Sequence, residues 1–181
     1  MKDKYQIVLS GVGGQGLIAC GSLVAEAAII YEDKYATLTS SYGVETRGTF
    51  TKSDIIISGK EIYYPEVIKE DIVLSLAQVA YDRYIDKIDS DAILIYDSSL
   101  VTQIKDSKAK QYGFPFTDLA RELGNITVAN VIALGAIIKM SGILSQESVL
   151  NAIKDKYEEK PKVMELNTKA LEKGLEIAAI I

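Results

Sequence analysis

The chain has 181 residues, a net charge of −5 at pH 7, 48% hydrophobic residues and 25% charged residues. This length and composition are typical of one globular domain with a single core, so we expect one domain spanning residues 1–181. Acidic and basic residues are interleaved and leave no broad basic surface. The charge pattern therefore argues against nucleic acid as a partner.

Histidine is absent, and cysteine occurs once, at Cys20. Without imidazole the chain lacks a Ser-His-Asp or Cys-His nucleophile, a histidine general base and a histidine metal ligand. One cysteine cannot hold an iron–sulfur cluster or form an internal disulfide. Because Cys20 falls on the apolar stripe of a predicted helix, we interpret it as a buried hydrophobe rather than a reactive thiol.

The sequence also predicts no targeting signal. Its charged start, residues 1–4, leads into a short strand rather than the hydrophobic stretch of a signal peptide. No apolar run approaches the roughly 20 residues that span a bilayer. We expect a cytoplasmic protein without a membrane partner.

The first predicted elements are a strand, a tight turn and a helix. The apolar run at residues 5–10 enters the sequence Gly-Val-Gly-Gly-Gln-Gly, and an apolar helical stripe follows. Such glycines permit positive φ and close approach of a ligand, and free N–H groups at a helix start favour an anion. The candidate contacts are Gly11, Gly13, Gly14, Gln15 and Gly16. Alternatively, Gly11 and Gly16 serve only close packing of strand and helix.

A second strand is predicted at residues 35–39, followed by a polar loop at residues 40–50. The strand ends in Thr-Ser-Ser, where an NAD-binding unit would have an acidic residue for the ribose. The loop should emerge at the same sheet edge as the glycine turn, where ligands of open α/β sheets bind. Arg47 can offer paired donors to a phosphate, or else form a surface pair with Glu45.

A hairpin is predicted next, with a strand at residues 53–58 and a return at residues 61–64. Strands at 71–76 and 92–96 then flank a helix at 77–88, which is predicted to bury Val79, Ala80, Tyr84 and Ile88. Asp97, at a strand end, either meets a ligand or caps and turns the chain, and turn preferences favour the second role.

The final third is predicted to be helical, after a short strand at residues 110–113. Thr117 and Ser145 are suitable N-caps, and Pro161 suits the first turn of a last helix. Strands that alternate with helices predict an α/β fold: a Rossmann-like three-layer sandwich with a mainly parallel sheet, one β-hairpin and a helical C-terminal third.

The motifs together resemble a known family over nearly the whole chain. They are the glycine turn, the loop Ser-Tyr-Gly-Val-Glu-Thr-Arg-Gly at residues 41–48, the strand at 53–58, the Tyr64-Pro65 pair, and the segment 125–130 before Ala-Leu-Gly. In this order they resemble the gamma subunit, or gamma domain, of the 2-oxoacid:ferredoxin oxidoreductases. In that family a second glycine usually follows Arg47-Gly48, whereas here Thr49 follows.

The resemblance implies a noncatalytic subunit of an enzyme that converts a 2-oxoacid and coenzyme A (CoA) to acyl-CoA, carbon dioxide and reduced ferredoxin. Thiamine diphosphate and the iron–sulfur clusters are then expected on partner subunits: alpha, beta and, as an open point, delta. The gamma domain is linked with CoA binding. The resemblance therefore assigns CoA to the glycine turn and to the loop residues Tyr42, Glu45, Arg47 and Gly48.

Two alternatives stay open at the level of sequence. The same glycine turn is compatible with a self-sufficient NAD- or flavin-binding oxidoreductase, or with a purely structural assembly subunit. The motifs look closest to 2-oxoglutarate-type subunits, while pyruvate and branched-chain types remain alternatives.

Overall fold

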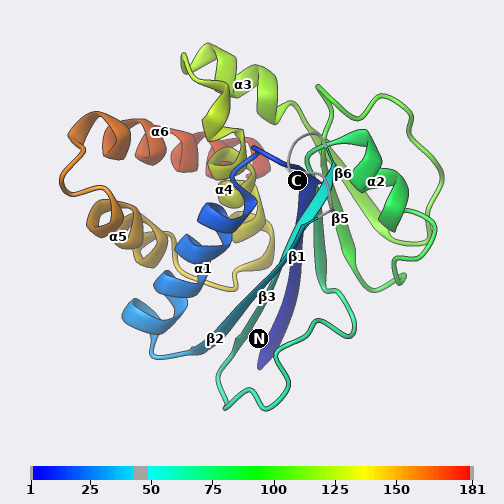
Figure 1. Cartoon of the computed structure of the whole chain (residues 1–181), viewed down its shortest axis with the longest axis horizontal. Coiled ribbons are helices and arrows are strands. Elements are labelled where there is room, and N and C mark those ends of the chain that lie inside the picture. Colours follow the sequence, from blue (N-terminus) through cyan, green and yellow to red (C-terminus); the bar gives the residue numbers. More distant parts are fainter. Residues whose placement is uncertain (1, 43–48, 180–181) are drawn as a thin grey trace.

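A computed structural model describes residues 2–42 and 49–179 (Figure 1). The strands are β1 (Lys4–Val12), β2 (Tyr35–Tyr42), β3 (Phe50–Ser58), β4 (Ile72–Ser75), β5 (Ile93–Asp97) and β6 (Lys110–Phe114). The helices are α1 (Leu17–Glu32), α2 (Gln78–Tyr84), α3 (Phe116–Glu122), the short 3₁₀ helix η1 (Ile126–Val128), α4 (Ala129–Ser141), α5 (Gln146–Lys156) and α6 (Pro161–Ala178).

The strands form one sheet in the order β2-β3-β1-β4-β5-β6. Parallel pairs join β1, β4, β5 and β6, whereas β3 is antiparallel to both β1 and β2. β3 is thus the one reversed strand of this sheet, and the prediction of a mainly parallel sheet is confirmed.

The β-hairpin exists, but its predicted position at residues 53–64 is wrong. It is formed by β2 and β3 instead. The reason lies in the register: Ser58 pairs with Lys4 on one side and with Tyr35 on the other. Both edges of β3 are occupied, so residues 61–64 have no edge of β3 to join.

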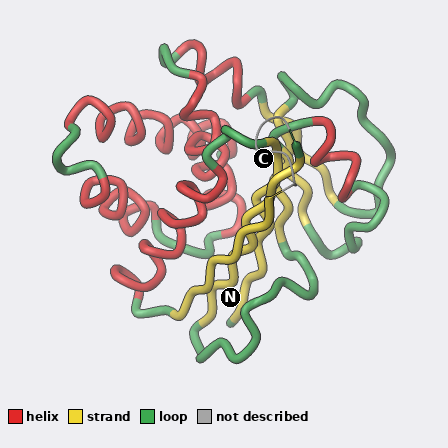
Figure 2. Tube along the Cα trace, in the orientation of Figure 1, coloured by secondary structure: helices red, strands yellow, loops and turns green. Residues whose placement is uncertain are grey.

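Helices cover the two faces of the sheet unequally (Figure 2). On one face α1 and α4 pack against inward residues such as Ile7, Leu9 and Leu74. On the other face α2 covers the alternate residues, including Val8 and Val73. Two buried clusters on opposite faces of one sheet confirm the predicted three-layer α/β sandwich.

α2 is shorter than predicted, and its predicted buried face is only partly correct. Ala80 and Ile88 are buried, as predicted. Tyr81 and Ile85 are buried against the sheet, whereas Val79 is exposed and Tyr84 is half-buried. The prediction for Val79 is therefore wrong. The burial follows from the position of Tyr81, whose ring meets Tyr96 edge-on at a centroid distance of 5.4 Å.

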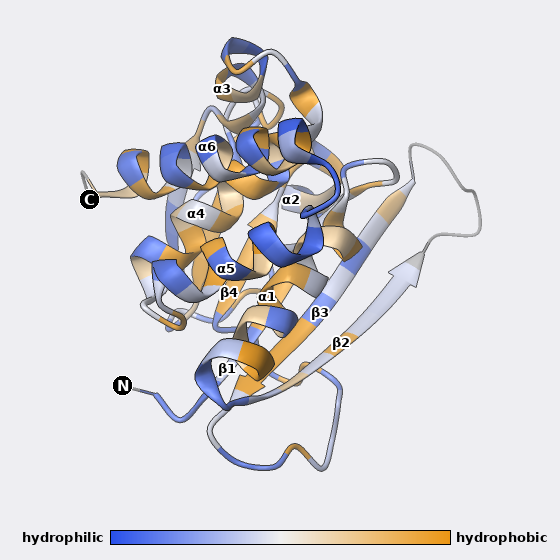
Figure 3. Cartoon of the chain, turned by 90° about the vertical axis from the view of Figure 1, so that its left-hand side faces the viewer, coloured by the Kyte–Doolittle hydropathy of each residue, from blue (hydrophilic) through white to orange (hydrophobic). Residues whose placement is uncertain are grey.

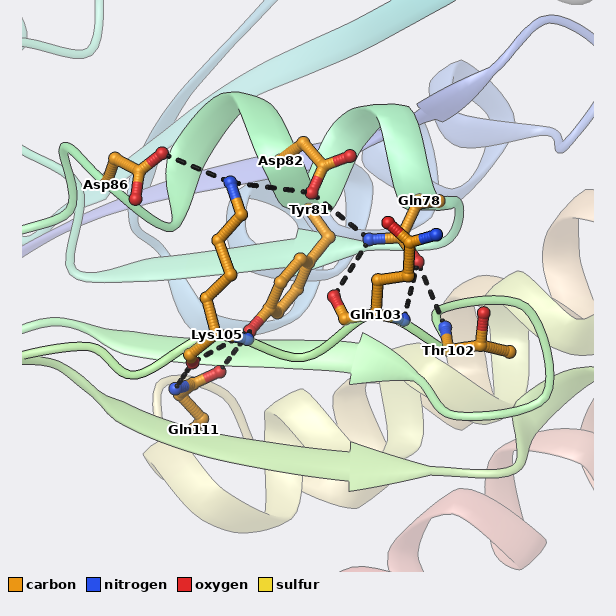
Figure 4. Close-up of polar contacts among 8 residues, drawn as sticks. All are labelled: Gln78, Tyr81, Asp82, Asp86, Thr102, Gln103, Lys105 and Gln111. Carbon is orange, nitrogen blue, oxygen red and sulfur yellow. Dashed lines mark hydrogen bonds and ion pairs between the residues drawn. The ribbon is translucent and has the colours of Figure 1, made fainter.

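No helix covers the connection between β5 and β6, and side chains of α2 hold it instead (Figure 4). The Gln78 amide oxygen accepts from the backbone N–H groups of Thr102 and Gln103, both at 3.0 Å. The Tyr81 hydroxyl accepts from the Lys105 N–H at 3.0 Å and donates to the Gln111 side chain at 2.7 Å. These bonds satisfy backbone groups that a helix would otherwise pair internally.

The C-terminal third is helical, as predicted, and α4 is its central helix. Residues from Ala129 to Ile138 are all buried, because α4 contacts α1, α3, α5 and α6. Figure 3 shows the outer helices α5 and α6 with hydrophilic outward surfaces over this apolar interior. Within residues 2–42 and 49–179, every helix is too short or too polar to cross a bilayer.

Cys20 lies on the inner side of α1, as predicted, and is buried. Burial raises the pKa of its thiol to about 12, because the thiolate would lose its hydration there. At neutral pH this cysteine is a protonated core residue.

Candidate functional site

The glycine turn joins β1 to α1 through two residues with positive φ. Gly14 has φ +97° and Gly16 has φ +68°, both in the region that favours glycine. Gly16 is the N-cap of α1 and supplies no side chain to cap it, and the first helical turn contains no acidic residue. The first turn of α1 therefore contributes no carboxylate to compensate the positive end of the α1 dipole.

Several backbone donors at this turn have no acceptor among the described residues. The N–H of Gly13 donates to the Thr49 carbonyl at 3.2 Å, and that of Gln15 donates to the Val12 carbonyl at 3.3 Å. In the part of the chain that the structure describes, the N–H groups of Gly14, Gly16 and Leu17 have no hydrogen-bond partner. Unpaired donors at a helix start form an anion-binding site.

A cavity of about 280 Å³ opens at these donors. Its wall includes the turn from Val12 to Gly16, the first residues of α1, and Thr51 to Ser53 of β3. Lys52 is the cationic residue of this wall, and its ammonium group pairs with Asp54 at 2.5 Å. The described side chains of this wall therefore carry no net charge, and the backbone N–H groups are the feature that favours an anion there.

Gly11 and Gln15, two of the predicted contacts, have structural roles. The Gln15 amide accepts from the Val12 N–H and donates to the Leu76 carbonyl, both at 2.8 Å, and so joins the ends of β1 and β4. A Cβ on Gly11 would lie 2.1 Å from the Gln15 amide oxygen. Gly11 therefore makes room for the amide, and any ligand contact of these two residues remains a prediction.

Replacing Gln15 by methionine is expected to lower the free energy of unfolding by about 2 kcal/mol. Methionine keeps the length of the side chain but removes two hydrogen bonds that contribute about 1 kcal/mol each. Urea unfolding measures the change. Gln146→Met, at an exposed position in the first turn of α5, is the control and should change stability by less than about 0.5 kcal/mol. Equal stability of the two variants would contradict this role of Gln15.

Asn130 supports the glycine turn through a side-chain hydrogen bond and was not among the predicted site residues. Its amide N–H donates to the Gly16 carbonyl at 3.0 Å, from the start of α4. A Cβ on Gly16 would lie 2.5 Å from the same nitrogen, so Asn130 holds the left-handed residue in place. The contact joins residues 114 positions apart, and no local pattern in the sequence indicates it.

The predicted loop contacts are only partly placed. Tyr42 ends β2 and pairs with Thr51, and the next described residue, Thr49, accepts from the Gly13 N–H. The β2–β3 connection therefore leaves the sheet beside the glycine turn, as predicted. Glu45, Arg47 and Gly48 lie outside the described residues, and their contacts remain predictions.

Asp97 has the capping role that turn preferences favoured. Its carboxylate is fully buried and accepts from the Thr117 hydroxyl at 2.5 Å and the Thr117 N–H at 3.1 Å. It also accepts from the Ser99 N–H at 3.0 Å. Pro115, not Thr117, is the N-cap of α3, so the predicted cap was placed two residues too late. The Asp97 oxygens are occupied by the chain itself.

A wider hollow of about 450 Å³ lies on the other face, between β3 and α2. Arg83 stacks there over Phe50 at 4.3 Å, and Lys87 lies on the same wall. Glu70 faces the same hollow, and Lys52 is already paired with Asp54. Arg83 and Lys87 against Glu70 leave this hollow a small net positive charge, but it offers no helix start with unpaired backbone donors, and among the described residues the glycine turn therefore remains the better anion site.

These features define a class: an α/β-sandwich protein whose first strand–turn–helix unit presents unpaired backbone donors to an anionic ligand. The family model described as "Pyruvate ferredoxin/flavodoxin oxidoreductase" matches residues 6–177. The chain therefore belongs to the pyruvate ferredoxin/flavodoxin oxidoreductase family.

Individual relatives agree with the family. The 2-oxoglutarate synthase subunit KorC of Methanocaldococcus jannaschii is 41% identical over 98% of this chain and 96% of that subunit. The crystal structure of a keto/oxoacid ferredoxin oxidoreductase gamma subunit from Geobacter sulfurreducens is 36% identical, with a TM-score of 0.86 over 98% of this chain and 99% of that one.

A third relative shows the fold alone. The 2-oxoglutarate:ferredoxin oxidoreductase of Magnetococcus marinus, solved with 2-oxoglutarate, coenzyme A and succinyl-CoA bound, is 23% identical. Its TM-score is 0.90, and the match covers 100% of this chain and 32% of that one. The same fold therefore occurs both as a separate subunit and as part of a longer chain.

The resemblance inferred from the sequence is confirmed: this chain is a gamma-type subunit of a 2-oxoacid:ferredoxin oxidoreductase. The alternative of a self-sufficient NAD- or flavin-binding enzyme is not favoured.

Proposed function

We propose that this subunit binds CoA at the glycine turn on behalf of a 2-oxoglutarate-type oxidoreductase. The CoA pyrophosphate accepts hydrogen bonds from the N–H groups of Gly14, Gly16 and Leu17, at the positive end of α1. The single observation that supports this most is that these donors have no partner among the described residues and line a cavity of about 280 Å³.

The preferred substrate is 2-oxoglutarate. Relatives named 2-oxoglutarate synthase subunit KorC are 41% and 35% identical to this chain along nearly its whole length. The residues that select the 2-oxoacid are expected on the other subunits, so this assignment depends on the relatives alone. Pyruvate and branched-chain 2-oxoacids are the alternatives.

The division of labour between subunits follows from the side chains. One buried cysteine and no histidine leave this chain without ligands for an iron–sulfur cluster. We therefore assign the clusters to alpha, beta or delta subunits, and the family resemblance implies that thiamine diphosphate also lies on partner subunits, from which ferredoxin accepts electrons. We expect the assembled enzyme in the cytoplasm.

Purification of the assembled enzyme through a tag on this chain tests the proposal. We expect larger subunits that carry the thiamine and iron–sulfur sites to copurify, and the complex to reduce ferredoxin fastest with 2-oxoglutarate and CoA. A complex that prefers pyruvate would contradict the substrate assignment alone. A chain that purifies alone and is stabilised by NAD or flavin, but not by CoA, would contradict the whole proposal.

A further inference from the structure

The connection between β3 and β4 exposes large apolar side chains that the fold does not use. Residues 59–71, the aromatic loop, contain neither helix nor strand. Tyr63 is 87% exposed, Ile68 is 74% exposed and Tyr64 is 52% exposed. A connection of roughly this length without regular structure is uncommon and usually functional, and exposed apolar clusters mark interaction surfaces.

The aromatic loop is held in place at both ends, so its exposed side chains stand on a fixed backbone. At its start the Gly59 N–H donates to the Asp3 carbonyl at 3.0 Å, and near its end the Ile68 N–H donates to the Gln6 side chain at 2.9 Å. Val67 packs on the buried cluster beneath α2. Binding of a partner to this surface therefore requires little further ordering of the loop backbone, so the entropy lost on binding is small.

Unpaired carboxylates surround the aromatic side chains. Tyr63 and Tyr64 donate to Glu61 and Glu66 at 3.0 and 2.7 Å, and neither glutamate meets a cation among the described residues. The neighbouring cations are occupied elsewhere: Lys60 pairs with Asp3, and Lys69 pairs with Asp89 and Asp91. The surface is therefore apolar at its centre and acidic at its rim.

The acidic rim selects the kind of partner. A second copy bound across a two-fold axis would bring this acidic surface against an identical acidic surface, which like-charge repulsion disfavours. A surface with apolar pockets and a lysine- or arginine-rich rim is complementary instead. Because the chain is a subunit of a larger oxidoreductase, the partner that fits is one of its larger subunits.

We propose that the aromatic loop is the main docking surface of this chain for a larger subunit of the oxidoreductase. The loop follows Ser58, which pairs with the first residue of β1, so it lies at the opposite end of the sheet from the glycine turn (Figures 1 and 3). Docking here leaves the α1 N-terminus open to CoA. The inference builds on the assembly part of the proposed function.

The double variant Tyr63→Ser with Ile68→Ser tests the proposal in the coexpressed enzyme. We expect at least a tenfold loss of the larger subunits that copurify, because exposed aromatic anchors dominate binding energy. The control is Ile29→Ser with Ile30→Ser on α1, whose side chains are 51% and 63% exposed. The control should retain assembly, and both variants should keep the urea midpoint of the native chain.

Each possible outcome bears on the proposal. Full assembly of the loop variant, or loss of assembly in the α1 control alone, would overturn it while leaving CoA binding untouched. An isolated chain that is dimeric by light scattering, and monomeric after Tyr63→Ser, would replace it with self-association. Charge reversal by Glu61→Lys with Glu66→Lys should weaken assembly at least threefold at low salt and less at high salt.

Discussion

Gly14→Val in the assembled enzyme is expected to weaken CoA binding about 100-fold. At φ +97° a β-branched residue is strained, so the turn must move and withdraw the free N–H groups of Gly14 and Gly16. Two hydrogen bonds to a charged phosphate contribute about 1.5 kcal/mol each, and each 1.4 kcal/mol is a tenfold change in affinity. Isothermal titration of the complex with CoA measures the loss.

Gly142→Val is the matched control for backbone strain. Gly142 has φ +61° after α4, and, like Gly14, it has open space where a Cβ would be placed. Both variants should lose about 1–3 kcal/mol of stability. Only the Gly14 variant should lose CoA affinity, and equal affinities would show that the turn does not hold the coenzyme.

Gly174→Ala is expected to be the most destabilising single-methyl change in the helical layer. A Cβ on Gly174 would lie 1.9 Å from the Ile132 carbonyl oxygen and 2.9 Å from the Gly135 Cα. Both contacts are to backbone, so α6 must move away from α4. We expect a net loss of about 2–3 kcal/mol, after the gain in helix propensity of about 1 kcal/mol. The melting temperature should fall by roughly 5–10 °C.

Gly21→Ala is the control for Gly174→Ala, because the added methyl group would meet a side chain instead of the backbone. Gly21 also lies within a helix, and its Cβ would meet the Leu38 Cδ1 at 2.7 Å. The end of a leucine side chain can rotate away, so the expected change is less than about 1 kcal/mol. If Gly174→Ala and Gly21→Ala lowered the free energy of unfolding equally, the close backbone contact between α4 and α6 would not account for the effect of Gly174→Ala.

The sequence predicted the elements whose evidence is local. The apolar run before the glycines and the 3.6-residue stripe after them determine β1 and α1, and the caps at Ser145 and Pro161 locate the starts of α5 and α6. Gly135, noted only as part of the family motif, is explained by the α4–α6 contact. For β1, α1, α5 and α6 the residues that determine the element are close to one another in the sequence. Gly135 was noted only because the family motif contains it, and its contact with α6 is not local.

The features that the sequence did not predict depend on pairing between distant segments. Residues 61–64 look like a return strand, and only the occupation of both edges of β3 shows that they cannot pair. The Gln15 amide looks free until Leu76, 61 residues away, is placed beside it. Asn130 is likewise revealed as the support of Gly16 only by the position of α4.

Hydrogen exchange of the assembled enzyme tests the central claim most directly. The N–H groups of Gly14, Gly16 and Leu17 have no protein acceptor in the described structure, so they should exchange within milliseconds to seconds without ligand. Saturating CoA should slow exchange in a peptide covering residues 13–20 at least tenfold, with no comparable change at the start of α5. Unchanged exchange in that peptide, at a CoA concentration that supports full activity, would contradict the account.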